Sequence, residues 1–77
     1  MMLGMKYGDL MRLCKRKSLI VKLIDKFFHI ELLKVIGQKE TYIGINRDIV
    51  TISTYDKEKA DDFISKEKEK INIEENM

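Results

Sequence analysis

Near the N-terminus, apolar side chains recur at the spacing that is typical of a helix. Leu10, Leu13 and Cys14 fall on one face when the chain is wound helically, which predicts a helix over residues 5–17. Asp9 near its start and the cations at its end suit the dipole of such a helix.

A second helical pattern lies near the C-terminus. Asp56 is a residue type that caps helix N-termini, and strong helix formers follow it over residues 57–70. Phe63 and Ile64 should anchor this helix to the rest of the fold, because they belong to a narrow apolar stripe. The stripe consists of Ala60, Phe63, Ile64 and Ile71.

Between the helices, residues 41–54 have the pattern of a β-hairpin. Residues 41–46 and 49–54 are rich in β-branched side chains, and Asn46-Arg47-Asp48 supplies the polar residues of a turn. Gly44 interrupts the first of these strands, which indicates a bulge or the close approach of another backbone.

Residues 18–36 fit two patterns. A helical reading gives a polar face that ends at His29, because Glu31 and Lys34 fall on the opposite side. A strand reading covers the whole stretch, with a turn at Asp25-Lys26, and the β-branched and aromatic residues favour it. We therefore expect two strands, whose apolar faces are Leu19, Val21 and Leu23 in the first and Phe28, Ile30 and Leu32 in the second.

These elements predict an α+β fold. It consists of an N-terminal helix, a four-stranded antiparallel β-meander and a C-terminal helix, with both helices on one face of the sheet. Residues 1–73 should form a single small domain, and residues 74–77 a frayed C-terminal tail.

The helical reading of the middle stretch gives a different fold. Helices over residues 5–17, 18–28 and 30–36 would precede a hairpin wing at 41–54 and the last helix. This order resembles a winged helix-turn-helix over about two-thirds of the chain. The resemblance implies a mostly α protein with a β-hairpin wing that binds nucleic acid.

With 77 residues the chain buries only a small core, and such domains are commonly reinforced by disulfides, a metal or a partner. Cys14 is the only cysteine, and with His29 it falls short of the roughly four ligands of a Cys/His metal site. Association with another protein or with a second copy, as a homodimer, is the remaining route. A lone cysteine and no apolar leader favour the cytoplasm, and charges within residues 19–36 argue against a membrane span.

Residues suited to catalysis are few. Cys14 and His29 are the one nucleophile–base pair of the sequence, and Cys14 lies on an apolar helix face, where a free cysteine behaves as a small hydrophobe. The glycines match no phosphate-binding or dinucleotide-binding motif. We therefore expect a protein that is not an enzyme and takes no cofactor and no metal.

Charge is distributed unevenly along the chain. Residues 1–55 carry ten Lys/Arg and five Asp/Glu, a net +5, whereas residues 56–77 carry five Lys and eight Asp/Glu, a net −3. Cations concentrate near the N-terminus, and tyrosines stand at both ends of the hairpin. The candidate binding residues are Lys15, Arg16, Lys17, Tyr42, Arg47 and Tyr55.

These features predict a small intracellular protein–protein interaction module. In size and helix–strand–helix plan the chain is similar to small accessory proteins of phages and mobile elements, some of them anti-CRISPR inhibitors. That resemblance carries no residue correspondence, and it implies an inhibitor or accessory role. The alternative function is a winged-helix-like nucleic-acid binder, with the basic N-terminal region on phosphates and Arg47 at the wing tip.

Overall fold

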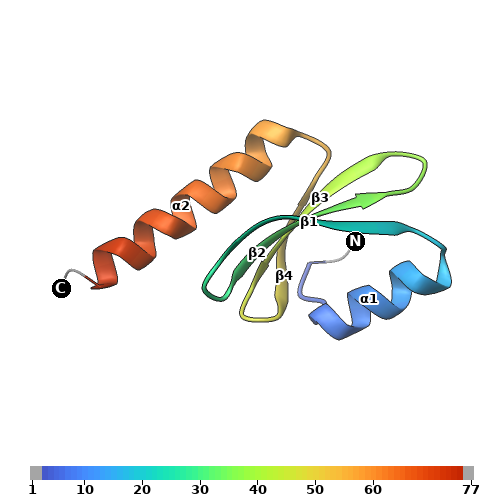
Figure 1. Ribbon diagram of the computed structural model, residues 1–77, viewed down its shortest axis with the longest axis horizontal. Helices are drawn as coiled ribbons and strands as arrows, with labels where there is room; N and C mark the ends of the chain where they lie inside the picture. The colour runs from blue at the N-terminus through green and yellow to red at the C-terminus, as the bar shows by residue number, and fades with distance from the viewer. Residues whose placement is uncertain (1–2, 76–77) are drawn as a thin grey trace.

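A computed structural model describes residues 3–75, with side chains as far as residue 71, and has two helices and one sheet (Figure 1). The elements are α1 (Tyr7–Arg16), β1 (Ile20–Phe27), β2 (Ile30–Ile36), β3 (Glu40–Asn46), β4 (Ile49–Thr54) and α2 (Lys57–Glu75). The strands form one antiparallel sheet in the order β1-β2-β3-β4. The predicted α+β meander is confirmed. The winged-helix alternative is wrong, because residues 20–36 pair as strands.

The two helices pack on opposite faces of the sheet (Figure 1). Leu10 and Cys14 of α1 cover one face, and Ala60 and Ile64 of α2 cover the other. The expectation that both helices share one face is therefore wrong. Strands β2 and β3 are apolar on both faces, so burying them requires a helix on each side. The face under α1 contains Leu33, Val35, Ile43, Ile45 and Val50, and the face under α2 contains Ile30, Leu32 and Tyr42.

The turn between β1 and β2 lies later than expected. It consists of Phe28 and His29, with Phe27 paired to Ile30, so the prediction of a turn at Asp25-Lys26 is wrong. Both polar residues lie within β1, where a register shift between Leu23 and Asp25 marks a β-bulge. The Asp25 carboxylate bonds to Lys68 of α2, as described below, and the Lys26 ammonium lies 3.9 Å from the Glu31 Oε1.

The β3–β4 hairpin closes where it was predicted to close. Arg47 and Asp48 form its turn, with φ angles of 52° and 66°. Positive φ at both central residues is the signature of a type I′ turn, whose twist matches that of the flanking strands. A register shift beside Gly44 confirms the predicted bulge.

Helix α2 begins as predicted, since the Asp56 Oδ1 accepts a hydrogen bond from the Glu58 N–H at 2.9 Å. Phe63 and Ile64 anchor it to the sheet. The helix continues to Glu75, beyond the expected end at residue 70, so the first two residues of the expected tail are helical. Asn76 and Met77 lie outside the described residues. Neither helix in the described part of the chain is long and apolar enough to span a lipid bilayer.

Candidate functional site

Cys14 and His29 lie in different parts of the fold. The Cys14 side chain is 2% exposed between α1 and the sheet, and burial raises the pKa of its thiol, which disfavours the reactive thiolate. His29 lies in the β1–β2 turn. Among the residues that the structure describes, no three His, Cys, Asp or Glu side chains gather as metal ligands would. Cys14 acts here as an apolar side chain of the core.

The structure separates the six predicted binding residues. Lys15, Arg16 and Lys17 are exposed at the C-terminal end of α1, and Tyr55 follows the end of β4. Arg47 lies in the β3–β4 turn, at the opposite end of that hairpin.

Tyr42 is buried beneath α2. Its side chain is 9% exposed and packs with Ile30 and Ile64, while the Lys34 Nζ lies 5.9 Å from its ring centroid. An anchor for a partner has to be accessible, so Tyr42 takes no part in the surfaces described below.

Lys17 and Tyr55 meet at one hollow of about 630 Å³. Tyr55 is 68% exposed, the most exposed of the large apolar side chains that the structure describes. The Lys39 Nζ lies 5.3 Å from the centroid of its ring, within range of a cation–π interaction. We call this site the Tyr55 hollow; it is lined by Lys17, Leu19, Val35, Gly37, Gln38, Lys39, Thr41 and Tyr55.

The end of α1 builds one wall of the hollow. The Lys17 N–H donates to the Leu13 carbonyl, Ser18 adopts a φ of 57°, and the Leu19 N–H donates to the Cys14 carbonyl at 2.8 Å. A residue with positive φ at this position ends a helix and reverses the chain. The reversal sends Leu19 back against the sheet.

Gly37 in the β2–β3 turn forms part of the floor beside Leu19. A Cβ on residue 37 would lie 2.6 Å from the Leu19 Cδ2, so only glycine leaves this side chain in place. Val35 is buried next to it. The hollow therefore has an apolar floor with two ammonium groups at its rim.

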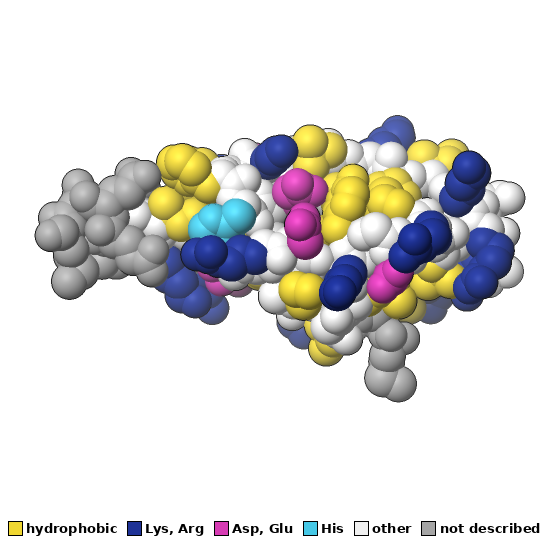
Figure 2. Space-filling model, turned by 90° about the horizontal axis from the view of Figure 1, so that it is seen from below, with side chains coloured by type: hydrophobic (Ala, Val, Ile, Leu, Met, Phe, Trp, Pro, Cys, Tyr) yellow, Lys and Arg dark blue, Asp and Glu magenta, His cyan; other side chains and the backbone are white. Residues whose placement is uncertain are grey.

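The charged side chains that line the hollow are cationic, Lys17 and Lys39. None of the described residues that line it is acidic. Within the described part of the chain, Arg12 pairs with Asp9, whereas Lys15, Arg16 and Lys17 form no ion pair. Lys and Arg side chains crowd the end of the molecule where α1 lies (Figure 2), and the acid-rich α2 lies across the sheet.

A second surface was missed by the sequence reasoning. Among the residues that the structure describes, four of the six exposed large apolar side chains belong to β1 or to the turn that follows it. The sequence predicts Leu23 on an apolar strand face with Leu19 and Val21, and the order of strands that places it at an edge cannot be read from an alternating pattern. The four residues along this edge of the sheet are Ile20, Leu23, Ile24 and Phe28, which are 58%, 57%, 45% and 60% exposed.

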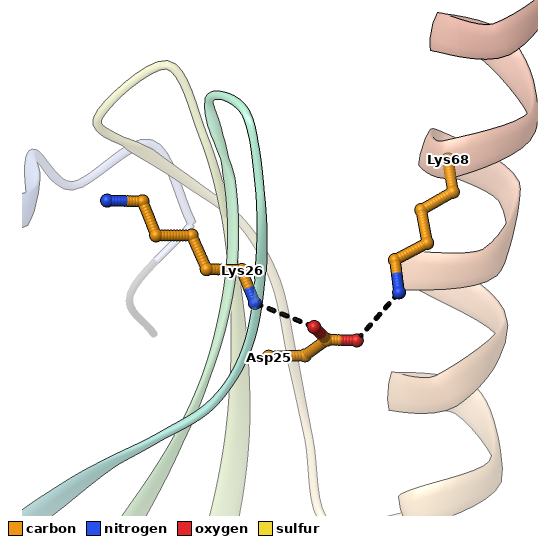
Figure 3. A network of polar contacts seen from close by, with 3 residues as sticks. All are labelled: Asp25, Lys26 and Lys68. Atoms are coloured by element: carbon orange, nitrogen blue, oxygen red, sulfur yellow. Dashed lines mark hydrogen bonds and ion pairs between the residues drawn. The ribbon is translucent and has the colours of Figure 1, made fainter.

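Asp25 ties β1 to α2 (Figure 3). Its Oδ2 accepts a hydrogen bond from the Lys68 Nζ at 3.0 Å, and its Oδ1 accepts one from the Lys26 N–H at 2.8 Å. The bond from Lys68 is the main cause that holds the pKa of the Asp25 carboxyl below its ordinary value. The same ammonium lies 5.7 Å from the centroid of the Phe27 ring.

Comparison of the chain with protein-family models, with curated proteins and with solved structures gives no significant match.

Proposed function

We propose that this chain is a non-enzymatic protein–protein interaction module that binds an acidic segment of a partner protein in the Tyr55 hollow. The observation that carries the proposal is that Lys17, Lys39 and Tyr55, from three separate parts of the chain, surround one apolar floor. Exposed tyrosines are enriched among the residues that dominate binding energy at protein interfaces.

The lining indicates the chemistry of the partner. Leu19 and Val35 offer contacts to an apolar side chain, and the ammonium groups of Lys17 and Lys39 attract carboxylates. The fitting segment therefore has an apolar or aromatic residue flanked by Asp or Glu. A duplex phosphate backbone has no apolar group to fill the floor, which favours a protein over a nucleic acid.

The proposal includes an inhibitor or accessory role, because binding alone is enough to perform it. A module of this kind acts by covering a surface that its partner needs, and it requires no chemistry of its own. The size and plan of the chain, which are similar to those of small accessory proteins of phages and mobile elements, support this role.

The test is selection from a random-peptide library against the wild-type chain, followed by affinity measurements on the enriched peptides. We expect peptides that combine acidic and apolar residues. Tyr55→Ala should weaken their binding by about 30-fold or more, as truncation of an interface anchor does. Lys17→Glu should slow association and reduce its dependence on salt.

A matched control is Lys57→Glu, which makes the same charge change at an exposed position of α2. It should leave peptide affinity unchanged. Enrichment of peptides without acidic residues, or equal binding by the Tyr55 variant, would contradict the proposal.

Nucleic acid is the alternative ligand for this protein. The sheet separates the cations of α1 from the acidic α2, so the two helices do not present their charges on one face. We expect only weak, sequence-independent duplex binding in gel-shift titrations at physiological salt. A sub-micromolar, sequence-dependent complex lost on replacing Lys15, Arg16 and Lys17 by Ala would instead identify a nucleic-acid-binding protein.

A further inference from the structure

The two edges of the sheet are protected differently. Along β4, the Gly4 N–H donates to the Val50 carbonyl and the Val50 N–H donates to the Met5 carbonyl, both at 2.8 Å. The N-terminal segment thus covers the start of that edge. In the described residues, no backbone hydrogen bond from outside the sheet reaches β1. Apart from the Lys26 N–H, which donates to the Asp25 Oδ1, the backbone groups on the outer side of β1 have no partner in the described residues, and such a row is a template for another strand.

Apolar side chains are exposed along this open edge. Ile20, Leu23 and Ile24 of β1 are each about half exposed, and Phe28 extends the apolar surface into the turn. Isolated surface residues of this kind are common, but a run of them on an uncovered edge strand is typical of an interface.

The bulge in β1 places two opposite charges on one face of the strand. Residues that lie opposite each other in neighbouring strands share a face. Lys22 lies opposite Lys34, whose ammonium rests over the Tyr42 ring, and Asp25 lies opposite Leu32. Both partners belong to the α2 side of the sheet. Lys22 and Asp25 therefore point to the same side although they are three residues apart.

The row of β1 on the α2 side is complementary to itself when reversed. Its order is Ile20, Lys22, Asp25 and Phe27, because Ile20 lies opposite Ile36 and Phe27 opposite Ile30. In the reversed row, Phe27 takes the position of Ile20, and Asp25 and Lys22 exchange positions. Each charged residue then faces a residue of opposite charge.

We infer that two copies of this chain associate through their β1 edges, antiparallel, about a two-fold axis between Leu23 and Ile24. Each Lys22 then lies opposite Asp25 of the second copy, and each Ile20 lies opposite Phe27 of the second copy. The apolar pair at the axis is Leu23 with Ile24. An isologous contact of this kind closes on itself as a dimer.

The charges of β1 favour a second copy of this chain as the partner, and they favour one register of pairing. Sliding one strand by a single residue would oppose Lys22 to Ile24 or to the like charge of Lys26. Asp25 can accept the additional cation, because a carboxylate offers about four acceptor positions and its bonds to Lys26 and Lys68 use two (Figure 3). The inference uses the β1 edge and does not depend on the Tyr55 hollow.

The experiment is sedimentation equilibrium of the full chain and of two charge reversals, Lys22→Asp and Asp25→Lys. The wild type should dimerise. Each variant alone opposes like charges twice, which should raise the dissociation constant of the dimer by about 30-fold or more. Mixed in equal amounts, the two variants restore both ion pairs and should form a heterodimer.

Lys57→Asp is the matched control, since it makes the same charge change at an exposed site on α2 and should dimerise as the wild type does. Circular dichroism establishes that each variant is folded. Leu23→Asp is a second variant, which should be monomeric because it places a charge at the axis. A wild type that stays monomeric at about 100 µM would overturn the inference. So would single variants that dimerise normally, or a mixture that forms no heterodimer.

Discussion

The ring of Phe63 in α2 occupies the space above Gly44 in β3 where any other residue would place its side chain. A Cβ on residue 44 would lie 2.5 Å from the Phe63 Cε2, and it would also clash with the Ile52 Cγ2. The approach that the sequence indicated at Gly44 is thus made by an aromatic side chain and not by a backbone. Gly44 lets α2 lie close to the sheet.

Gly44→Ala should destabilise the fold by about 1–3 kcal/mol, the usual cost of overpacking a filled site. Phe63→Ala should cost about 3 kcal/mol, because it removes the ring that anchors α2. Urea denaturation followed by circular dichroism measures both changes.

The double variant, Gly44→Ala with Phe63→Ala, tests whether the contact between these two residues causes the loss of stability. Without the Phe63 ring, the methyl group of Gly44→Ala loses its close contacts with Phe63 and keeps the one with Ile52, so its cost should fall by at least about 0.5 kcal/mol. If the free-energy costs of the two substitutions were strictly additive, the contact between Phe63 and residue 44 would not be the cause of the destabilisation.

Local signals explain why most elements could be predicted. The capping residue Asp56, the turn residues Arg47 and Asp48, and the alternation in residues 41–54 each act over a few neighbours, and the structure uses each of them as expected. The faces covered by the helices and the position of the β1–β2 turn depend on pairing between distant residues. In the sequence, Asp25-Lys26 has the pattern of a turn, whereas in the fold the Asp25 carboxylate bonds to Lys68, 43 residues away.

The candidate site could be predicted only in part, for the same reason. Lys17 and Tyr55 are predicted as binding residues from their residue types, but their proximity depends on how the end of α1 folds back beside the β2–β3 turn. Lys39 was not predicted as a binding residue, because the sequence around a lysine in a turn does not show whether it binds a partner or is only solvated. Tyr42 has the same residue type as Tyr55, and only its position under α2 separates the two.

Asp25→Asn should lower stability by less than about 1 kcal/mol at pH 7, because the pair with Lys68 is partly exposed and screened by solvent. The folded pKa of Asp25 is lowered, so its contribution is present above the ordinary value of 3.8 and is lost as the pH falls through the folded pKa. The difference between wild type and variant should therefore vanish in acid. Denaturation of dilute protein across the pH range measures it.

Lys68→Met is the control for this pair. It removes the cation and should reproduce the loss at pH 7, and adding it to Asp25→Asn should cost little more. A difference between wild type and Asp25→Asn that persists in strong acid would show that the carboxylate charge is not the cause.

Cys14 should react slowly with a thiol reagent in the native protein and rapidly in urea, because it is buried and its thiol pKa is raised. Cys14→Ala should keep the fold, at a cost of about 1 kcal/mol, and leave partner binding unchanged. Cys14→Ser should cost more, since it buries a hydroxyl group among apolar side chains. Fast labelling of the native chain would contradict the burial.

Replacing Arg47-Asp48 by Asn-Gly should stabilise the protein by about 1 kcal/mol. Both residues have positive φ, a conformation that costs most side chains about that much and that Asn-Gly adopts readily. The bonds at this turn come from the backbone and survive the change, since the Arg47 N–H donates to His29 and the Asp48 carbonyl accepts from Tyr7. The net charge is also unchanged, and thermal denaturation measures the gain.

The same double variant tests whether Arg47 contacts a partner. Six residues of β4 separate this turn from Tyr55, a distance of about 20 Å along an extended strand. Peptides selected on the Tyr55 hollow should therefore bind the stabilised variant as they bind the wild type. Arg47→Ala with Asp48→Ala is the control, because it removes the same side chains without relieving the backbone and should give no gain in stability. Weaker peptide binding by both variants would place Arg47 in the interface and contradict the separation of the two sites.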